Sequence, residues 1–233
     1  MDISTATALV TGANRGLGRQ IARELAGRGA TVYAGARDPS TVDLDGVIPL
    51  AVDITDPASV AAAAKAAGDV TVLVNNSGIA RDVDLLTGDL DDARAEMDTN
   101  YFGTLSMIRA FAPVITANGG GAILNVLSVL SWLSFPASGG YCASKSAAWS
   151  MTNSVRAQLH SSGIRVTGLH VGLMDTDMAA DLPGAKTDTA TVATLAVDAI
   201  AAGDFEVLAD ATSRSVRAGL SGGVEALYPN LAG

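Results

Sequence analysis

The chain contains only one cysteine, Cys142, and two histidines, His160 and His170, among 233 residues. A single cysteine excludes a disulfide bond within the chain and is typical of a reducing compartment. With so few thiolate and imidazole ligands, no transition-metal cluster can be recognised in the sequence. We therefore expect no metal, a core position for His170, and a small apolar packing role for Cys142.

Basic residues and long apolar runs are also scarce. Lysine and arginine number 15 against 24 aspartate and glutamate residues, so the net charge of −9 argues against a nucleic-acid surface. No run reaches the ~18 uninterrupted apolar residues of a membrane-spanning helix. The start, Met1 to Ser4, lacks the basic region of a signal peptide. The sequence thus predicts a cytoplasmic protein with no nucleic-acid or membrane partner.

Apolar residues are abundant at 48% of the chain, which predicts a sizeable core in one domain. Short apolar runs alternate with longer helical patterns, as expected for buried parallel strands joined by right-handed helical crossovers. Strands are predicted at Ala6–Val10, Thr31–Ala34, Val47–Ala51, Val70–Val74, Ala122–Leu127, Arg165–Leu169 and Glu206–Leu208. Helices are predicted near Gly18–Gly29, Pro57–Ala67, Asp91–Asn118, Tyr141–Ser161 and Thr189–Ala202. The fold class is α/β, a Rossmann-type doubly wound parallel sheet of about seven strands with helices on both faces.

A glycine-rich turn, Thr11-Gly12-Ala13-Asn14-Arg15-Gly16-Leu17-Gly18, connects the first strand to the first helix. Glycines at these positions let the backbone turn sharply and approach a pyrophosphate closely. The helix N-terminus supplies unpaired N–H groups and the positive end of a dipole. The turn therefore predicts dinucleotide binding.

The end of the second strand indicates which dinucleotide is bound. An acidic residue there would bind the ribose 2′-hydroxyl of NAD, but Ala36 and Arg37 occupy the position. Arg37 and Arg15 together suit a 2′-phosphate, so NADP(H) is predicted over NAD(H). Asp38 leaves two alternatives open, because it either takes the ribose role or belongs to a solvated turn before Pro39.

Tyr141 and Lys145 are four residues apart on a predicted helix and therefore share a face. An ammonium group beside a phenol favours the phenolate and is expected to lower the phenol's pKa. The pair thus predicts a general acid/base at Tyr141.

In their order along the chain, these motifs resemble those of the short-chain dehydrogenase/reductase family, of the compact single-domain type. The resemblance covers essentially the whole chain. The matching residues are Thr11-Gly12-x-x-x-Gly16-x-Gly18, Asp53, Asn75-Asn76-Ser77-Gly78, Asn100, Ser128, Tyr141-x-x-x-Lys145 and Gly172 to Thr176. The resemblance implies one domain over residues 1–233, with a cofactor half at about 1–120 and a catalytic and substrate half at about 121–233.

The resemblance also implies roles for individual residues. Tyr141 would protonate the carbonyl oxygen during reduction, and Ser128 would hold that oxygen. Lys145 would lower the pKa of Tyr141 and bind the nicotinamide ribose, and Asn100 would kink its helix and bind a proton-relaying water. The implied cofactor contacts are Gly12, Asn14, Arg15, Gly16, Leu17, Gly18, Arg37, Asp53, Ile54, Asn75, Ser77, Tyr141, Lys145, Gly172 and Thr176.

Two positions depart from the family pattern. Ser77 stands where the family usually has alanine, and Val171 stands where it usually has proline. The segment after Thr176 is short, which favours an open pocket that accepts varied carbonyl compounds. Expected wall residues are Leu130, Trp132, Leu133, Phe135, Leu173 and Met178, although Trp132 and Phe135 could equally belong to the core or a subunit interface.

The expected function is an NADPH-dependent carbonyl reductase or alcohol dehydrogenase acting on a ketone or aldehyde. The alternatives are a redox-neutral or ene-reducing family member, or a non-catalytic NADP(H)-sensing protein. The long helices near Asp91–Asn118 and Tyr141–Ser161 resemble those that pair family members, so a homotetramer is expected, with a dimer as the alternative.

Overall fold

A computed structural model describes residues 1–229 of the chain. Seven parallel strands form one sheet in the order β3-β2-β1-β4-β5-β6-β7, which confirms the predicted Rossmann-type topology. The strands are β1 (Thr7–Thr11), β2 (Thr31–Ala36), β3 (Ile48–Ala51), β4 (Val72–Asn75), β5 (Gly121–Val126), β6 (Ile164–His170) and β7 (Glu206–Leu208). The order reverses between β1 and β4, so a crevice is expected at their carboxyl ends.

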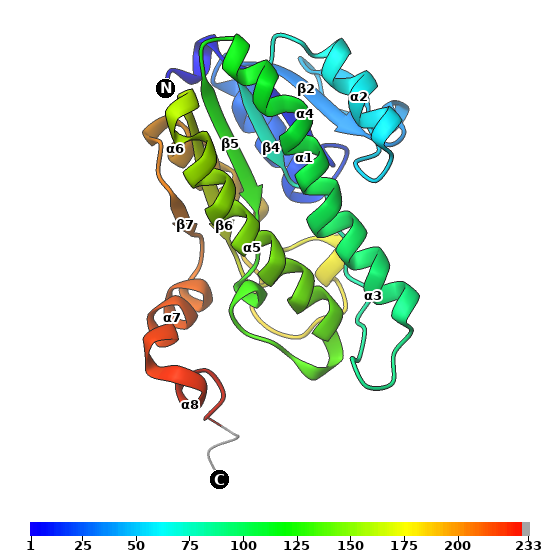
Figure 1. Cartoon of the computed structure of the whole chain (residues 1–233), viewed down its shortest axis with the longest axis vertical. Helices are drawn as coiled ribbons and strands as arrows, with labels where there is room; N and C mark the ends of the chain where they lie inside the picture. Colours follow the sequence, from blue (N-terminus) through cyan, green and yellow to red (C-terminus); the bar gives the residue numbers. More distant parts are fainter. Residues whose placement is uncertain (230–233) are drawn as a thin grey trace.

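Helices cover both faces of the sheet (Figure 1). On one face lie α1 (Gly16–Gly27) and α6 (Thr189–Ala202), which pack over Val10, Val72 and Leu124. On the other face lie α2 (Pro57–Ala66), α4 (Thr104–Ala117) and α5 (Gly139–Leu159). Because both faces are covered, the central strands are apolar throughout rather than alternating.

The predicted helix Asp91–Asn118 is present but irregular. It is divided into α3 (Leu90–Met97), a π-helical segment (Asp98–Gly103) and α4. The π segment widens the helix around Asn100, where the resemblance implied a kink. The irregularity turns the Asn100 side chain toward the end of β4, as its hydrogen bonds there demonstrate.

Two C-terminal helices were not predicted from the sequence. They are α7 (Ala211–Gly219) and α8 (Gly223–Leu227), which extend beyond the end of the sheet in Figure 1. The Tyr228 hydroxyl accepts a hydrogen bond from the backbone N–H of Ser134 at 2.8 Å. This part of the chain is therefore attached to the segment that follows β5.

Within residues 1–229, no helix is both long and apolar enough to cross a bilayer. The division into a cofactor half and a catalytic half stays a prediction.

Candidate active site

The turn after β1 forms a cradle of backbone atoms. Gly12 and Gly16 have positive φ angles of 65° and 53°, which residues with a side chain rarely adopt. A Cβ at Gly18 would lie 2.3 Å from the carbonyl oxygen of Gly12, so only glycine permits this close approach. Arg15 precedes α1 and provides no side-chain cap, which leaves the first N–H groups of the helix available to an anion. Leu17 is buried beneath the turn, and Asn14 is half-buried.

Thr11 and Asn76 hold the cradle in shape. The Thr11 hydroxyl accepts hydrogen bonds from the N–H groups of Asn76 and Ser77, at 2.9 and 3.0 Å. The Asn76 amide donates to the carbonyl oxygen of Thr11 at 2.9 Å. Sequence reasoning assigned no role to Asn76, although its place beside Asn75 after a buried strand was a usable signal. The Asn75 side chain itself is buried and donates a hydrogen bond to Asn125, so it points toward the neighbouring strand β5.

The end of β2 presents an available cation. None of the ion pairs between described residues involves Arg37, which is exposed. Asp38 accepts hydrogen bonds from the N–H and hydroxyl of Ser40, so it caps the turn after β2. Of the two alternatives for Asp38, this geometry matches the turn.

Asp53 and Ile54 follow β3. Hydrogen bonds from the Thr55 hydroxyl and N–H to the Asp53 carboxylate, with the positive charge of Arg37 nearby, lower the pKa of Asp53. Ile54 is buried where Gly103 of the π segment packs against it. Asp53 and Arg37 therefore lie near each other, at the carboxyl ends of β3 and β2.

Residues after β6 close the opposite side of the cradle. The Thr176 methyl group would lie 3.4 Å from a Cβ at Gly16, so the two segments are in contact. Arg15 pairs with Asp177 at 3.2 Å, and both side chains are exposed. The N–H of Gly172 donates to the Asp210 carboxylate at 2.5 Å.

Lys145 is buried next to Tyr141 on α5. Its Nζ donates to the carbonyl oxygen of Val126 at 3.0 Å and lies 5.6 Å from the centre of the Tyr141 ring. Burial lowers the pKa of Lys145 to about 8, because the charged form loses its hydration. The ammonium is therefore close to its titration midpoint at mildly alkaline pH.

The expected lowering of the Tyr141 pKa is wrong for the protein without cofactor. Burial raises the pKa of Tyr141 to about 12, and the Ser128 hydroxyl opposes this by favouring the ionised phenol. The negative charge of Glu96, and at alkaline pH that of an ionised Cys142, raise the pKa further. Desolvation thus outweighs the hydrogen bond from Ser128, and the phenol keeps its proton at neutral pH.

Ser128 follows β5 and is buried. Its Oγ accepts a hydrogen bond from the N–H of Leu130 at 3.1 Å, which leaves the hydroxyl hydrogen available for another acceptor. The His170 Nδ1 lies 3.2 Å from the Ser128 carbonyl oxygen and must donate the proton of this bond. His170 is fully buried, as expected, and thereby fixes the backbone at Ser128.

Of the alternatives for Trp132, the structure matches the core rather than the substrate wall. Its indole is buried and stacks on His170 with ring centres 3.7 Å apart. Phe135 and Met178, in contrast, are more than half exposed. Aromatic stacking with a buried histidine explains why an amphipathic tryptophan turns inward here.

Asn100 connects the catalytic helix to the end of β4. Its Oδ1 accepts the N–H of Ile79, and its Nδ2 donates to the Ile79 carbonyl and the Ser144 hydroxyl, each at 2.9 Å. A Cβ at Gly78 would lie 3.0 Å from the Asn100 Oδ1 and 3.6 Å from the Lys145 Nζ. The structure therefore brings Asn100, Ser128, Tyr141 and Lys145 together at the carboxyl edge of the sheet.

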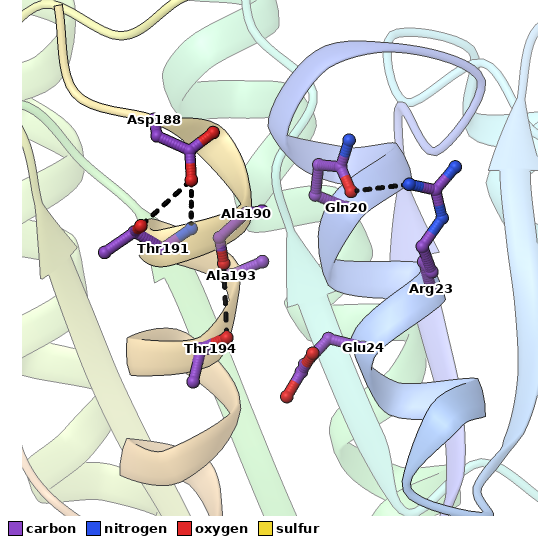
Figure 2. Close-up of a pocket in the computed structure, with 8 residues that line it drawn as sticks. All are labelled: Gln20, Arg23, Glu24, Asp188, Ala190, Thr191, Ala193 and Thr194. Atoms are coloured by element: carbon purple, nitrogen blue, oxygen red, sulfur yellow. Dashed lines mark hydrogen bonds between the residues drawn. The ribbon is translucent and has the colours of Figure 1, made fainter.

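A cavity of about 360 Å³ opens elsewhere, between α1 and α6 (Figure 2). It is lined by Gln20, Arg23, Glu24, Asp188, Ala190, Thr191, Ala193 and Thr194. Its polar groups bond to one another, as Gln20 does to Arg23 and Asp188 to Thr191. No predicted site residue lines this cavity, so it is separate from the site above.

Comparisons with known proteins agree with this geometry. The family described as short chain dehydrogenase matches residues 6–186. An NADP-dependent 3-hydroxy acid dehydrogenase of Schizosaccharomyces pombe is 31% identical over 187 residues, which cover 73% of this chain and 72% of the relative. The 3-oxoacyl-[acyl-carrier-protein] reductase FabG of Staphylococcus aureus is 34% identical over 188 residues, covering 75% and 76%. A short chain dehydrogenase from Burkholderia cenocepacia J2315, solved in complex with NADP, is 40% identical with a TM-score of 0.94 over 100% of both chains.

The buried His170 predicts a pH-dependent stability. Burial lowers the pKa of His170 to about 4. Protons therefore bind more readily to the unfolded chain as pH falls from ~6.5 to ~4, and the free energy of unfolding should decrease by roughly 3 kcal/mol over this range. His170→Gln should remove this part of the slope in urea unfolding measured at several pH values. The exposed His160→Gln is the matched control and should keep the slope; an unchanged slope in His170→Gln would contradict the assignment.

Proposed function

Because the chain belongs to the short-chain dehydrogenase/reductase family, we propose that it is an NADPH-dependent carbonyl reductase, reversible as an alcohol dehydrogenase. One observation carries the proposal: Tyr141 lies beside Ser128 and Lys145, and Lys145 lies against Gly78, next to Ser77, which contacts the glycine cradle at Gly12. The cradle fits a dinucleotide because its glycines carry no side chains that would keep a pyrophosphate away from the backbone N–H groups.

In the proposed reaction, a nicotinamide held through the glycine cradle and Lys145 would supply hydride to the carbonyl carbon. The Tyr141 hydroxyl donates its proton to the carbonyl oxygen as that oxygen gains negative charge. The raised pKa of Tyr141 supports this direction, since the proton is present at neutral pH. Ser128 donates its free hydroxyl hydrogen to the same oxygen, where a buried donor is most effective.

Lys145 has a different part in the reaction. Once the proton has left, its nearby ammonium stabilises the phenolate, and its remaining N–H groups are available to the nicotinamide ribose. Asn100 fixes Ile79 and Ser144 around the lysine. A proton path through water at Asn100 stays a prediction, because both ends of its amide are already bonded within the protein.

We propose NADP(H) rather than NAD(H) as the cofactor. Arg37 is exposed at the end of β2 without an ion pair, and Asp38 is engaged in its own turn. A guanidinium so placed suits a 2′-phosphate. Arg15 would add a second contact on leaving Asp177, its partner across the cradle. The NADP-bound Burkholderia structure supports this choice.

We propose a neutral, apolar ketone or aldehyde as the substrate. Apolar side chains are exposed on the segments that follow β4, β5 and β6, among them Leu85, Phe135 and Met178. Leu85 packs against Gly139 at the start of α5, next to Tyr141. Such a rim favours an apolar substrate body over a strongly hydrated one.

The charges near this rim disfavour an anionic carrier such as an acyl-carrier protein. Asp82, Asp84 and Asp181 lie on the segments that flank the site. The arginines of the same region are engaged, Arg81 with Asp92 and Arg15 with Asp177. Like charges at an entrance slow the approach of an anionic partner. The similarity to FabG therefore extends to the chemistry of the site and not, in this proposal, to its substrate.

We propose a homotetramer, with a dimer as the alternative. A groove of about 630 Å³ runs between the π segment and α5, and small residues such as Ala147 and Ser150 line it together with Tyr101 and Met151. Such a groove admits a helix of a second copy, and light scattering at micromolar concentration measures the outcome. The cytoplasmic location stays a prediction.

The first experiment is the oxidation of NADPH and NADH, followed by absorbance, across a panel of ketones, aldehydes, enones and acyl-thioesters. We expect turnover of neutral ketones or aldehydes with preference for NADPH. Turnover confined to acyl-thioesters would refute the substrate class. Tight NADPH binding without turnover would refute the reductase and favour a redox-neutral enzyme or a sensing protein.

Tyr141→Phe should reduce kcat by roughly 10²- to 10⁴-fold, because only the proton donor is lost. The dissociation constant for NADPH, measured by fluorescence titration, should stay nearly unchanged. Near wild-type turnover in this variant would contradict the mechanism.

Arg37→Ala should raise the KM for NADPH by roughly tenfold to hundredfold while changing that for NADH little, since one charge-assisted contact to the 2′-phosphate is lost. Arg23→Ala is a matched control, because Arg23 lines the separate cavity of Figure 2. Equal effects of Arg37→Ala on both cofactors would overturn the assignment of the phosphate contact.

A further inference from the structure

Glu96 is a fully buried carboxylate that the proposed reaction does not use. It lies on α3, four residues before Asn100. Its Oε1 accepts the N–H of Arg81 at 2.7 Å. Its Oε2 is buried and has no hydrogen-bond partner among the described residues. A buried carboxylate with one oxygen unpartnered is costly, so its retention calls for a function.

The free oxygen lies against the residue that precedes Tyr141. A Cβ at Gly140 would lie 2.3 Å from the Glu96 Oε2, closer than any side chain could come. Gly140 is in the first turn of α5, whose positive dipole end favours a nearby negative charge. The absence of a side chain at Gly140 therefore admits this carboxylate to the start of the catalytic helix.

Glu96 and Asn100 also hold one stretch of backbone between them. Asn100 bonds both the N–H and the carbonyl of Ile79, and Glu96 bonds the N–H of Arg81. The same carboxylate thus contacts the segment after β4 and the start of α5. Its position is fixed from two sides.

Several charged groups act on Glu96. Burial raises the pKa of Glu96, the hydrogen bond from the Arg81 N–H opposes this, the charges of Asp82 and Asp92 raise it, and the Arg81 guanidinium lowers it. From α5, Tyr141 and Cys142 are the titratable groups that respond to Glu96, since its negative charge raises the pKa of both. Ser128 from the end of β5 and Lys145 on α5 also face Tyr141.

We propose that Glu96 is a positioning residue that sets the pH range in which Tyr141 delivers its proton, by holding a buried negative charge against Gly140. This inference deepens the proposed function and rests on Tyr141 as the proton donor. The charge of Glu96 disfavours the phenolate and so keeps the donor protonated to higher pH. Glu96 thereby favours carbonyl reduction over alcohol oxidation, which requires the phenolate.

The test is the pH profile of kcat/KM for carbonyl reduction in Glu96→Gln, which keeps the shape of the side chain and removes its charge. Because a nearby negative charge is lost, the basic limb should move to lower pH by about half a unit. The acidic limb of alcohol oxidation should move in the same direction. Asp91→Asn, which removes an exposed charge from the same helix, is the matched control and should leave both limbs in place. A lower rate with unmoved limbs would reduce Glu96 to a structural clamp and overturn the proposal.

A measurement on unaltered Glu96 covers the case in which Glu96→Gln does not fold. The chain has only four glutamates, Glu24, Glu96, Glu206 and Glu225, so carbon-13 labelling of their carboxyl groups gives a simple spectrum. With NADP⁺ bound, the Glu96 signal should move once as Glu96 itself titrates. It should move a second time over the pH range of the basic limb, as Tyr141 ionises. Tyr141→Phe should abolish this second movement, and a signal that never moves there would overturn the proposal. An absence of carbonyl turnover in the wild-type protein refutes the proposed function instead, and the labelling experiment still reports on Glu96.

Discussion

The geometry of the site depends on the buried amide of Asn100. One side chain bonds both backbone groups of Ile79 and the hydroxyl of Ser144, and it thereby joins the end of β4 to the catalytic helix. The Asn100 side chain is buried, and an unpaired amide there would be costly. The π segment, the segment after β4 and the catalytic helix α5 therefore keep one relative position. Lys145 is held next to Gly78 as a consequence.

Loss of hydration is the second constraint, and it acts on both members of the Tyr141–Lys145 pair. It raises the pKa of the phenol to about 12 and lowers that of the ammonium to about 8, so each group is biased toward its neutral form. The phenol is thus prepared to donate a proton rather than to accept one, while Lys145 loses its own proton more readily than an exposed lysine. Ser128 and Glu96 shift the pKa of the phenol in opposite directions. The Ser128 hydroxyl lowers it, and the negative charge of Glu96 raises it.

The sequence predicted most of the sheet, because buried parallel strands are continuous apolar runs, and β7 was predicted to the residue. The sequence left the role of Asp38 open, because capping a turn and binding a ribose hydroxyl use the same carboxylate. The inward turn of Trp132 depends on His170, 38 residues later, which no local pattern reveals. Helix α7 is polar and buries only Ser213, and α8 has five residues with none buried, so neither presented an apolar segment to recognise in the sequence.

The π segment at Asp98–Gly103 has a consequence for how the chain can change length over evolution. Such a segment accommodates one residue more than the regular helical spacing, and the surplus is absorbed locally. Deletion of a single residue there would remove this surplus and restore the regular α-helical spacing, in which α3 and α4 keep their relative rotation. The widened turn that directs Asn100 to Ile79 would then be lost, while Glu96 and Phe111 would keep their places. A chain one residue shorter here should therefore stay folded and lose the geometry of the site, so selection on the length of this stretch acts through catalysis rather than through stability.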